Sequence, residues 1–384
     1  MKDFLPYGRQ NITEEDIESV INILKSDFLT QGPSIATFEE LIGNLTHSKY
    51  AVAVNSATSA LHLACLALDV KKGDEVWTVP NTFVASANCA LYCNATIDFV
   101  DINPFSWCMS PEALDKKIQE RLSKNKKLPK VIIPVHLAGQ SCEMEKIKEI
   151  ADKYNIKIIE DASHAIGGSY KGEPIGSCKY SDITVFSFHP VKIITTGEGG
   201  AAVCNDLKIA TKMSLLRSHG ITRDVSFMEN PSANPWYYEQ IELGYHFRMS
   251  DIHAALGISQ IKRIKDFLKI RNQIASKYNS ALQNINLKKQ QLYADTYSSR
   301  HLYIIRIDEK FHTEFMKDAR KKGIGVNLHY LPIHLQPYYK KLGFSEGTFP
   351  ESEQYAKEAV SLPIFVEMKN EDQDRVIDFV VNYL

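Results

Sequence analysis

Helix-like and strand-like stretches alternate along the chain from Thr13 to about Ser250, and this alternation constrains the fold more than any other feature. Short apolar runs that are rich in branched and aromatic residues are typical of buried strands. The clearest of these runs span residues 74–80, 95–102, 130–137, 156–162 and 182–188. Because strands that alternate with helices build a mainly parallel sheet with helices on both faces, the sequence predicts an α/β fold.

The chain beyond residue 250 has a different pattern. Residues 251–282 carry apolar side chains at helical spacing over a length that could link two lobes, and Ser250 is placed to cap their start. Residues 301–308 and 323–332 alternate like strands, while residues 372–384 look helical. These stretches predict a smaller α+β unit.

The length of the chain supports two domains, since 384 residues exceed the size at which a single core stops growing. We expect a large α/β domain over residues 1–250. A linking helix and a small C-terminal α+β domain would follow over residues 251–384.

A single lysine, Lys192, follows the last of the five apolar runs and precedes a glycine-rich turn. Pro190 ends the strand, so Lys192 lies just past a strand end. An amine held there and partly desolvated loses proton affinity and becomes a nucleophile toward an aldehyde. The alternative is a solvated surface lysine, which is the commoner use of this residue type.

The preceding strand ends in Asp161, with His164 three residues later. Pyridoxal 5'-phosphate (PLP) needs a lysine for its aldehyde and a carboxylate for its pyridine nitrogen, and Lys192 and Asp161 would supply both. Taken alone, an acid in the position of Asp161 is more often a strand-end or helix-capping residue. The pair is therefore the observation that favours a cofactor.

A phosphate site is indicated by the segment that begins at Asn55, where small hydroxylic residues lead directly into an apolar helix. The free amides of a first helical turn and the positive end of the helix dipole bind an anion without a charged side chain. Ser56, Ala57 and Thr58 are the candidates. An ordinary Ser/Thr helix cap is the alternative.

Whole motifs of this chain resemble those of the DegT/DnrJ/StrS nucleotide-sugar aminotransferases, which belong to the PLP-dependent transferases of fold type I with an aspartate aminotransferase-like fold. The resemblance covers nearly the whole chain. Its motifs are FLTQGPSIATFEE (28–40), NSATSALHL (55–63), TVPNTFVASAN (78–88), IEDASHAIG (159–167), FSFHPVKIITTGEGG (186–200), LRSHG (216–220), LGYHFRMSDIHAALGISQ (243–260) and NLHYLPIHLQPYY (327–339).

The resemblance implies roles for the matching residues. Lys192 falls on the lysine that bonds the cofactor aldehyde, Asp161 on the acid that pairs with the pyridine nitrogen, and His164 near the phenolic oxygen. The other matches are Phe83, which would stack on the cofactor ring, Ser56, Ala57, Thr58 and Ser187, which would surround the phosphate, and Tyr7, Thr30, His329 and Tyr330, which would lie around the substrate. Ordinary core packing is the alternative for His164 and Phe83, and packing or surface hydrogen bonding is the alternative for the four substrate residues.

One position departs from the family pattern. His246 stands where the family usually has an Asn that reaches the cofactor phosphate of the neighbouring subunit. An imidazole can still donate one hydrogen bond, so the role could persist with a new pH dependence, or it could have moved to another residue.

The activity implied by the resemblance is a ping-pong transfer of an amino group from L-glutamate to a nucleotide-linked ketosugar, with pyridoxamine 5'-phosphate as the carrier form. The wording of the motifs is most similar to that of enzymes that aminate carbon 4 of a UDP-linked 4-keto-6-deoxy-N-acetylhexosamine of the L-series, for pseudaminic acid biosynthesis. A D-series or 3-keto sugar is the alternative acceptor, and a PLP-binding member without catalysis is another. A dehydratase variant of the family has His in place of the lysine, so Lys192 argues against it. The resemblance also implies a homodimer with active sites shared across the interface.

The overall composition is typical of a cytoplasmic enzyme that acts on small molecules. With 45 basic and 46 acidic side chains, the chain has no charge excess that would favour nucleic acid or a membrane surface. Seven cysteines without a CxxC motif suit a reducing compartment, and we expect Cys89 and Cys93 to be buried thiols and no metal site. No apolar signal segment begins the sequence. The long polar and aromatic stretch over residues 220–240 is expected to be a functional loop near the substrate.

Overall fold

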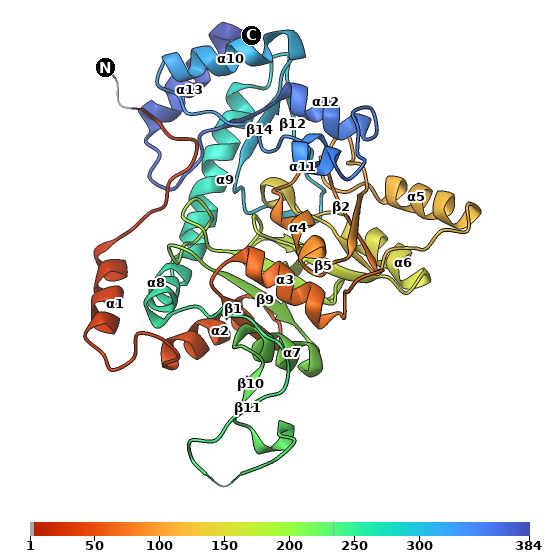
Figure 1. Ribbon diagram of the computed structural model, residues 1–384. Coiled ribbons are helices and arrows are strands. Elements are labelled where there is room, and N and C mark those ends of the chain that lie inside the picture. The colour runs from red at the N-terminus through yellow and green to blue at the C-terminus, as the bar shows by residue number, and fades with distance from the viewer. Residues whose placement is uncertain (1–3, 233) are drawn as a thin grey trace.

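A seven-stranded sheet forms the centre of the computed structural model, which describes residues 4–232 and 234–384 (Figure 1). In sheet order the strands are β1 (Tyr50–Val54), β9 (Gly200–Cys204), β8 (Ile183–Ser187), β5 (Lys157–Asp161), β4 (Val131–Ile133), β2 (Glu75–Thr78) and β3 (Thr96–Phe99). Strands β8, β5, β4, β2 and β3 pair in parallel, whereas β9 runs antiparallel to β8 and to β1. The predicted α/β fold with a mainly parallel sheet is confirmed, and the five predicted strands are β2, β3, β4, β5 and β8.

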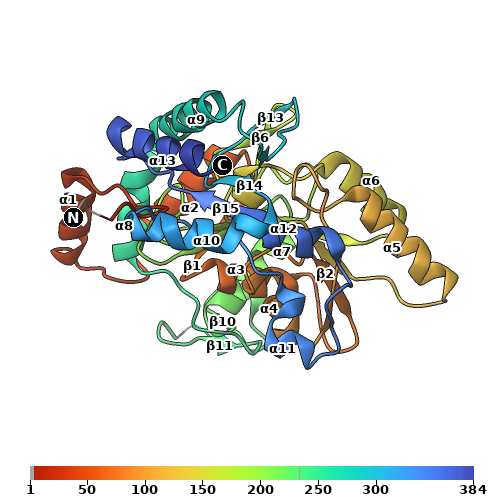
Figure 2. The ribbon, with the colours of Figure 1, turned by 90° about the horizontal axis from the view of Figure 1, so that it is seen from above.

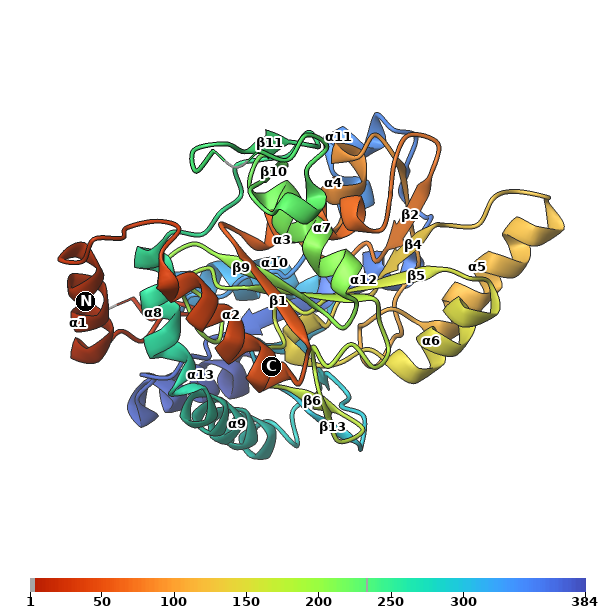
Figure 3. The ribbon, with the colours of Figure 1, turned by 90° about the horizontal axis from the view of Figure 1, so that it is seen from below.

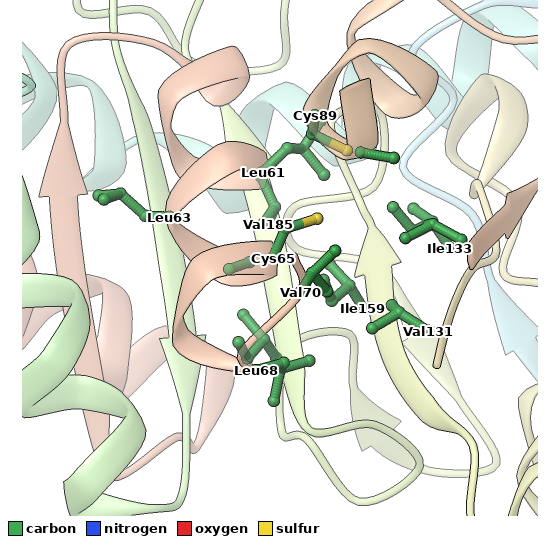
Figure 4. Packing of buried hydrophobic residues seen from close by; sticks show 14 of the residues in the cluster. Leu61, Leu63, Cys65, Leu68, Val70, Cys89, Val131, Ile133, Ile159 and Val185 are labelled. Atoms are coloured by element: carbon green, nitrogen blue, oxygen red, sulfur yellow. The ribbon is translucent and has the colours of Figure 1, made fainter. Parts of the chain in front are cut away.

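Helices cover both faces of this sheet, because successive strand residues point to opposite sides. One face packs against α3 (Ala57–Ala67), α4 (Ala85–Tyr92) and α7 (Leu207–Arg217), which lie together on one side of the strands in Figure 3. Figure 4 shows Leu61 and Cys65 of α3 packed toward Ile159 and Val185 of the sheet. The other face packs against α2 (Pro33–Thr46), α5 (Pro111–Ser123), α6 (Met144–Lys153) and α8 (Asp251–Ile261).

A second apolar cluster surrounds a small antiparallel sheet of β12 (Lys288–Lys289), β14 (Tyr303–Arg306) and β15 (Ala359–Leu362). Helices α9 (Ile264–Ala281), α10 (Glu309–Lys321) and α13 (Asn370–Tyr383) gather around it (Figure 2). Strand β14 and helix α13 match the predicted elements. Leu5 also packs in this cluster, and its carbonyl accepts a hydrogen bond from the amide of Gly325. The division of the chain at residue 250 remains a prediction.

Two expectations for this part of the chain were wrong. Residues 251–282 form two helices, α8 and α9, and the chain breaks between them at Arg263, whose side chain bonds to Asn11 and Asp16. Ser250 does cap α8, since its Oγ accepts from the amide of His253. Residues 323–332 make isolated bridges in place of a strand, because beyond Val326 the segment turns to anchor its side chains at a cavity described below.

Residues 220–240 contain a hairpin of β10 (Ile221–Thr222) and β11 (Glu239–Gln240) that projects from the body of the molecule (Figures 1 and 3). Ala233, within this stretch, lies outside the described residues. The described residues of the hairpin do not line the cavity that holds Lys192 in the same chain.

The remaining elements are short or lie at the edges. They are α1 (Glu14–Leu24), α11 (Pro337–Lys340), α12 (Pro350–Glu358), β6 (Ser169–Tyr170), β7 (Glu173–Pro174), β13 (Thr296–Tyr297) and the 3-10 turns η1 (Leu137–Gly139), η2 (Val225–Phe227) and η3 (Ile333–Leu335). All seven cysteines are free thiols, and Cys89 and Cys93 are buried. Among the described helices, none combines the length and the apolar character that a membrane span needs.

Candidate active site

A cavity of about 510 Å³ opens at the carboxyl ends of β5 and β8, where open α/β sheets place their ligands. It brings together most of the residues singled out from the sequence. These are Tyr7, Ser56, Ala57, Thr58, Phe83, Asp161, His164, Ser187, Lys192, His329 and Tyr330.

Lys192 lies in the turn after β8 and is partly buried. Burial lowers the pKa of its ammonium group from 10.5 to about 8, while the negative charge of Asp161 acts in the opposite direction. About a tenth of this amine is therefore unprotonated at pH 7, far more than for a lysine with the usual pKa, and the unprotonated form is the one that attacks an aldehyde.

Asp161 is the last residue of β5, and its side chain is buried with both oxygens held. Ser86 on α4 donates to Oδ2 over 2.7 Å, and the amide of Ser163 donates to Oδ1 over 3.1 Å. These bonds fix the plane of the carboxylate toward the cavity. The Ser86 hydroxyl is in turn 3.0 Å from that of Thr82.

The first turn of α3 supplies the anion-binding end of the cavity. Ser56 is its N-cap and accepts from the amide of Ser59, which leaves the amides of Ala57 and Thr58 at the open end of the helix. Strand β9 approaches this turn so closely that a Cβ at Gly200 would lie 2.4 Å from the amide nitrogen of Ala57. Glycine at this position is what allows the strand and the helix end to meet.

Phe83 offers a flat apolar face at the cavity. Its side chain is 57 % exposed although it lines the pocket, and its ring centroid lies 6.3 Å from that of Tyr330. An aromatic ring with one free face is suited to stacking on a planar ligand.

His329 and Tyr7 close another side of the cavity. Nδ1 of His329 lies 2.8 Å from Oγ of Ser361, and burial together with the charge of Lys192 lowers the pKa of this imidazole to about 3. The ring of Tyr7 lies 5.1 Å from that of His329, and the Tyr7 carbonyl accepts from the amide of Ile364. His329 is thus a neutral side chain with a fixed position.

Two predicted site residues lie outside this cavity in their own chain. Thr30 is exposed and forms a backbone bridge with Ser250. His246 is also exposed, and its ring stacks on that of His219 at 5.4 Å. Their assigned roles remain predictions, and the role of His246 requires a second chain.

The cavity also contains residues that sequence reasoning did not assign to it. They are Leu61, Thr82, Ala85, Ser86, Val135, Ser163, His189, Val191, Glu198, Gly199, Asn327 and Leu328. Ser86 stands within the matched motif of residues 78–88, but its contact with Asp161 follows from the placement of α4 against β5 and leaves no local signal in the sequence.

The residues present fit PLP by their own chemistry. A lysine with a lowered pKa, a buried carboxylate, an open helix N-terminus and a free aromatic face converge on one cavity. The fold and this donor set define a PLP-dependent enzyme of fold type I.

The chain belongs to the DegT/DnrJ/EryC1/StrS aminotransferase family, whose members match residues 10–381. It is 42% identical to an uncharacterized protein of Methanocaldococcus jannaschii, over 99% of this chain and 96% of the relative. It is 39% identical to the UDP-4-amino-4,6-dideoxy-N-acetyl-beta-L-altrosamine transaminase of Campylobacter jejuni serotype O:23/36, over 99% of this chain and 97% of the relative.

Two solved structures have the same fold over almost their full length. The aminotransferase PseC of Helicobacter pylori superposes with a TM-score of 0.90 at 31% identity, covering 99% of both chains. The PLP-form of Spr1654 from Streptococcus pneumoniae superposes with a TM-score of 0.90 at 30% identity, covering 99% of this chain and 98% of that one. The protein is a sugar aminotransferase that uses PLP, and the predicted fold type, enzyme class and cofactor are confirmed.

Proposed function

We propose that the protein transfers the amino group of L-glutamate to carbon 4 of a UDP-linked 4-keto-6-deoxy-N-acetylhexosamine of the L-series, a step toward pseudaminic acid. The names of the Campylobacter relative and of PseC, whose structure is described as that of an aminotransferase in pseudaminic acid biosynthesis, support this sugar. The observation that carries the amino-transfer chemistry is the convergence of Lys192 and Asp161 on one cavity.

When bound, the cofactor supplies the aldehyde that takes up the donor's amino group and a ring that draws electrons from the reacting carbon. Lys192 removes the proton from the α-carbon of glutamate and, in the second half of the cycle, delivers a proton on the way to the amino sugar. Asp161 keeps a proton on the pyridine nitrogen, and its two hydrogen bonds hold it in place for this task. The amides of Ala57 and Thr58 would hold the phosphate, with Ser56 and Ser187 beside them.

A homodimer with shared active sites forms part of the proposal. Glutamate carries two carboxylates and a UDP-sugar carries a diphosphate, yet Lys192 is the only lysine among the described residues of the cavity, and no arginine lines it. The cavity has three histidines, His164, His189 and His329. Two of them, His164 and His329, have lowered pKa values and stay neutral. A neighbouring copy is therefore the source we propose for further donors, with His246 as the family position that would reach the phosphate.

The sugar is tested by offering purified enzyme, PLP and glutamate the L-series and D-series UDP-linked 4-ketosugars as competing acceptors, with a 3-ketosugar in a parallel reaction. We expect NMR to identify the 4-amino sugar of the L-series as the main product. A preference for the D-series epimer or the 3-ketosugar would replace the proposed acceptor and leave the aminotransferase class intact. Failure of glutamate to convert the bound cofactor in the absence of any sugar would exclude glutamate as the donor.

A further inference from the structure

The hydrogen bonds of His164 determine which of its ring nitrogens carries the proton. Nδ1 lies 3.3 Å from the amide nitrogen of Ala138, which can only donate, so Nδ1 is an acceptor. Burial, with the charge of Lys192 as a second cause, lowers the pKa of this imidazole well below its usual value. The neutral ring therefore has a single proton, and it is on Nε2.

The Nε2 proton of His164 forms a hydrogen bond with another side chain of the protein. Nε2 of His164 lies 3.1 Å from the hydroxyl oxygen of Tyr330, so His164 donates and the tyrosine oxygen accepts. The proton of the tyrosine hydroxyl then points elsewhere. Burial raises the pKa of Tyr330, so the hydroxyl keeps its proton, and the residue lines the cavity.

The backbone conformation of the turn at Ala138 directs the amide of Ala138 toward His164. Ala138 adopts left-handed angles, with φ 62° and ψ 6°, which cost free energy for a residue other than glycine. The carbonyl of Ala138 accepts from Leu302, and that of Gly139 accepts from Ser299. These two carbonyl hydrogen bonds anchor the turn, so the direction of the Ala138 amide is fixed.

We propose that the hydroxyl of Tyr330 donates a hydrogen bond to a ligand oxygen in the cavity. His164 is then a positioning residue, because its Nε2 proton holds the tyrosine oxygen in place. The acceptor is an oxygen with partial or full negative charge, on the cofactor ring or on the sugar. The sugar alternative rests on the proposed function, whereas the cofactor alternative does not.

Other titratable groups face this pair. Asp161 and Tyr7 act on Tyr330, while Lys192, His329 and His301 lie close to His164. The ring of His301 is 4.3 Å from that of His164, and burial lowers its pKa as well. His164 and His301 therefore both stay neutral near pH 7, and neither takes up a proton from the hydroxyl of Tyr330.

The first test measures the ¹⁵N imidazole resonances of His164 in the cofactor-free protein, assigned by their loss in His164→Gln. We expect a neutral ring with the proton on Nε2 from pH 6 to pH 8. A doubly protonated ring at pH 7, or a proton on Nδ1, would overturn the proposal without any change at Tyr330.

The second test titrates the visible absorption of bound cofactor in Tyr330→Phe. Loss of a donor to a charged oxygen destabilises the deprotonated form, so the pH midpoint of the colour change should rise by about one unit. His164→Leu should shift the midpoint in the same direction, and His164→Gln, which can still donate to Tyr330, should restore it. Tyr293→Phe, which removes a hydroxyl bonded to Ser106 outside the cavity, is the matched control.

Steady-state kinetics distinguishes the two candidate acceptors, the oxygen of the cofactor ring and the oxygen of the sugar. An unchanged midpoint combined with a KM for the ketosugar raised about tenfold and a nearly constant kcat would assign the donor to the sugar. If Tyr330→Phe changes neither the midpoint nor the KM in folded protein, Tyr330 is not the donor.

Discussion

Ser86 donates a hydrogen bond of 2.7 Å to Oδ2 of Asp161, and this contact joins the first turn of α4 to the end of β5. The other oxygen, Oδ1, accepts from the amide of Ser163. One of the two donors is therefore a side chain that can be removed by substitution, whereas the other belongs to the backbone. The orientation of the key carboxylate depends on a serine on a different element.

Ser86→Ala should leave Asp161 charged but held by the amide of Ser163 alone, so its orientation is less well fixed. We expect kcat to fall about tenfold, since a buried hydrogen bond to a charged group contributes about 1.5–3 kcal/mol and water can replace part of it. Steady-state kinetics at saturating glutamate would measure this change. Ser123→Ala, on the exposed side of α5, is the matched control, and equal kcat values for the two variants would show that Ser86 is not needed.

Asp161→Asn keeps the size of the side chain and removes its charge. Without a negative group the pyridine nitrogen is no longer held protonated, so the reaction with glutamate should slow by at least two orders of magnitude while glutamate still binds. Stopped-flow absorbance of the donor half-reaction separates the two quantities. A rate within threefold of the unsubstituted enzyme would contradict the role of Asp161.

The lowered pKa of Lys192 predicts how cofactor-free protein takes up PLP. The unprotonated amine is the reactive form, so the uptake rate should rise with pH through a midpoint near 8. Because the charge of Asp161 raises this pKa, Asp161→Asn should move the midpoint to lower pH. Rapid-mixing absorbance from pH 6.5 to pH 9.5 measures both curves, and a midpoint near 10.5 would mean that Lys192 is not desolvated.

The lowered pKa of Lys192 also affects the free energy of unfolding. Its effect on the pH dependence is opposite to that of a lysine in a salt bridge, whose pKa is raised. Between about pH 8 and pH 10.5 the unfolded chain binds a proton at Lys192 that the folded chain has lost, so this residue makes the free energy of unfolding rise with pH in that window. Below pH 8 it destabilises the cofactor-free fold. Urea titrations of the unsubstituted protein and Lys192→Met at pH 7 and pH 10 should show the larger difference at pH 7.

Much of the fold could be predicted from the sequence because the central strands are continuous apolar runs. The two central strands outside these runs, β1 and β9, have weaker sequence signals. Strand β9 consists of small residues, Gly200–Cys204, whose low strand propensity is overcome by pairing with β8 and β1 on either side. Residues 323–332 show the reverse, since their alternation reflects anchoring at the cavity and not pairing in a sheet.

The site was predictable where chemistry demands a residue type, as at Lys192 and Asp161. It was not predictable where one side chain acts on another across the fold. The contact of Ser86 with Asp161 spans 75 positions, and that of Tyr330 with His164 spans 166 positions. Such pairs are set by how elements pack, which local patterns do not report.

Gly200→Ala should disrupt the anion-binding end of the cavity. The added Cβ would lie 2.4 Å from the amide nitrogen of Ala57, so the first turn of α3 has to move away from β9. Overpacking of this kind costs about 1–3 kcal/mol, and we expect the Kd for PLP to rise at least tenfold. Gly8→Ala, whose Cβ would make an ordinary 3.7 Å contact with Val191, is the control in thermal unfolding and PLP titration. Equal PLP affinity in the two variants would contradict the role of Gly200.

A shared active site predicts that two inactive variants can restore each other. Lys192 lies in the cavity of its own chain, whereas His246 is exposed outside that cavity and would serve a neighbour. If His246→Ala is inactive, a mixed dimer with Lys192→Ala has one site with both defects and one site with neither. Random exchange at equal concentrations makes half of the dimers mixed, so the mixture should recover about a quarter of the unsubstituted activity. Subunit exchange is verified with differently tagged chains, and a double variant carrying both changes, mixed with either single variant, is the control that should recover nothing. A mixture that exchanges subunits fully and stays inactive would show that His246 does not complete the site of a partner.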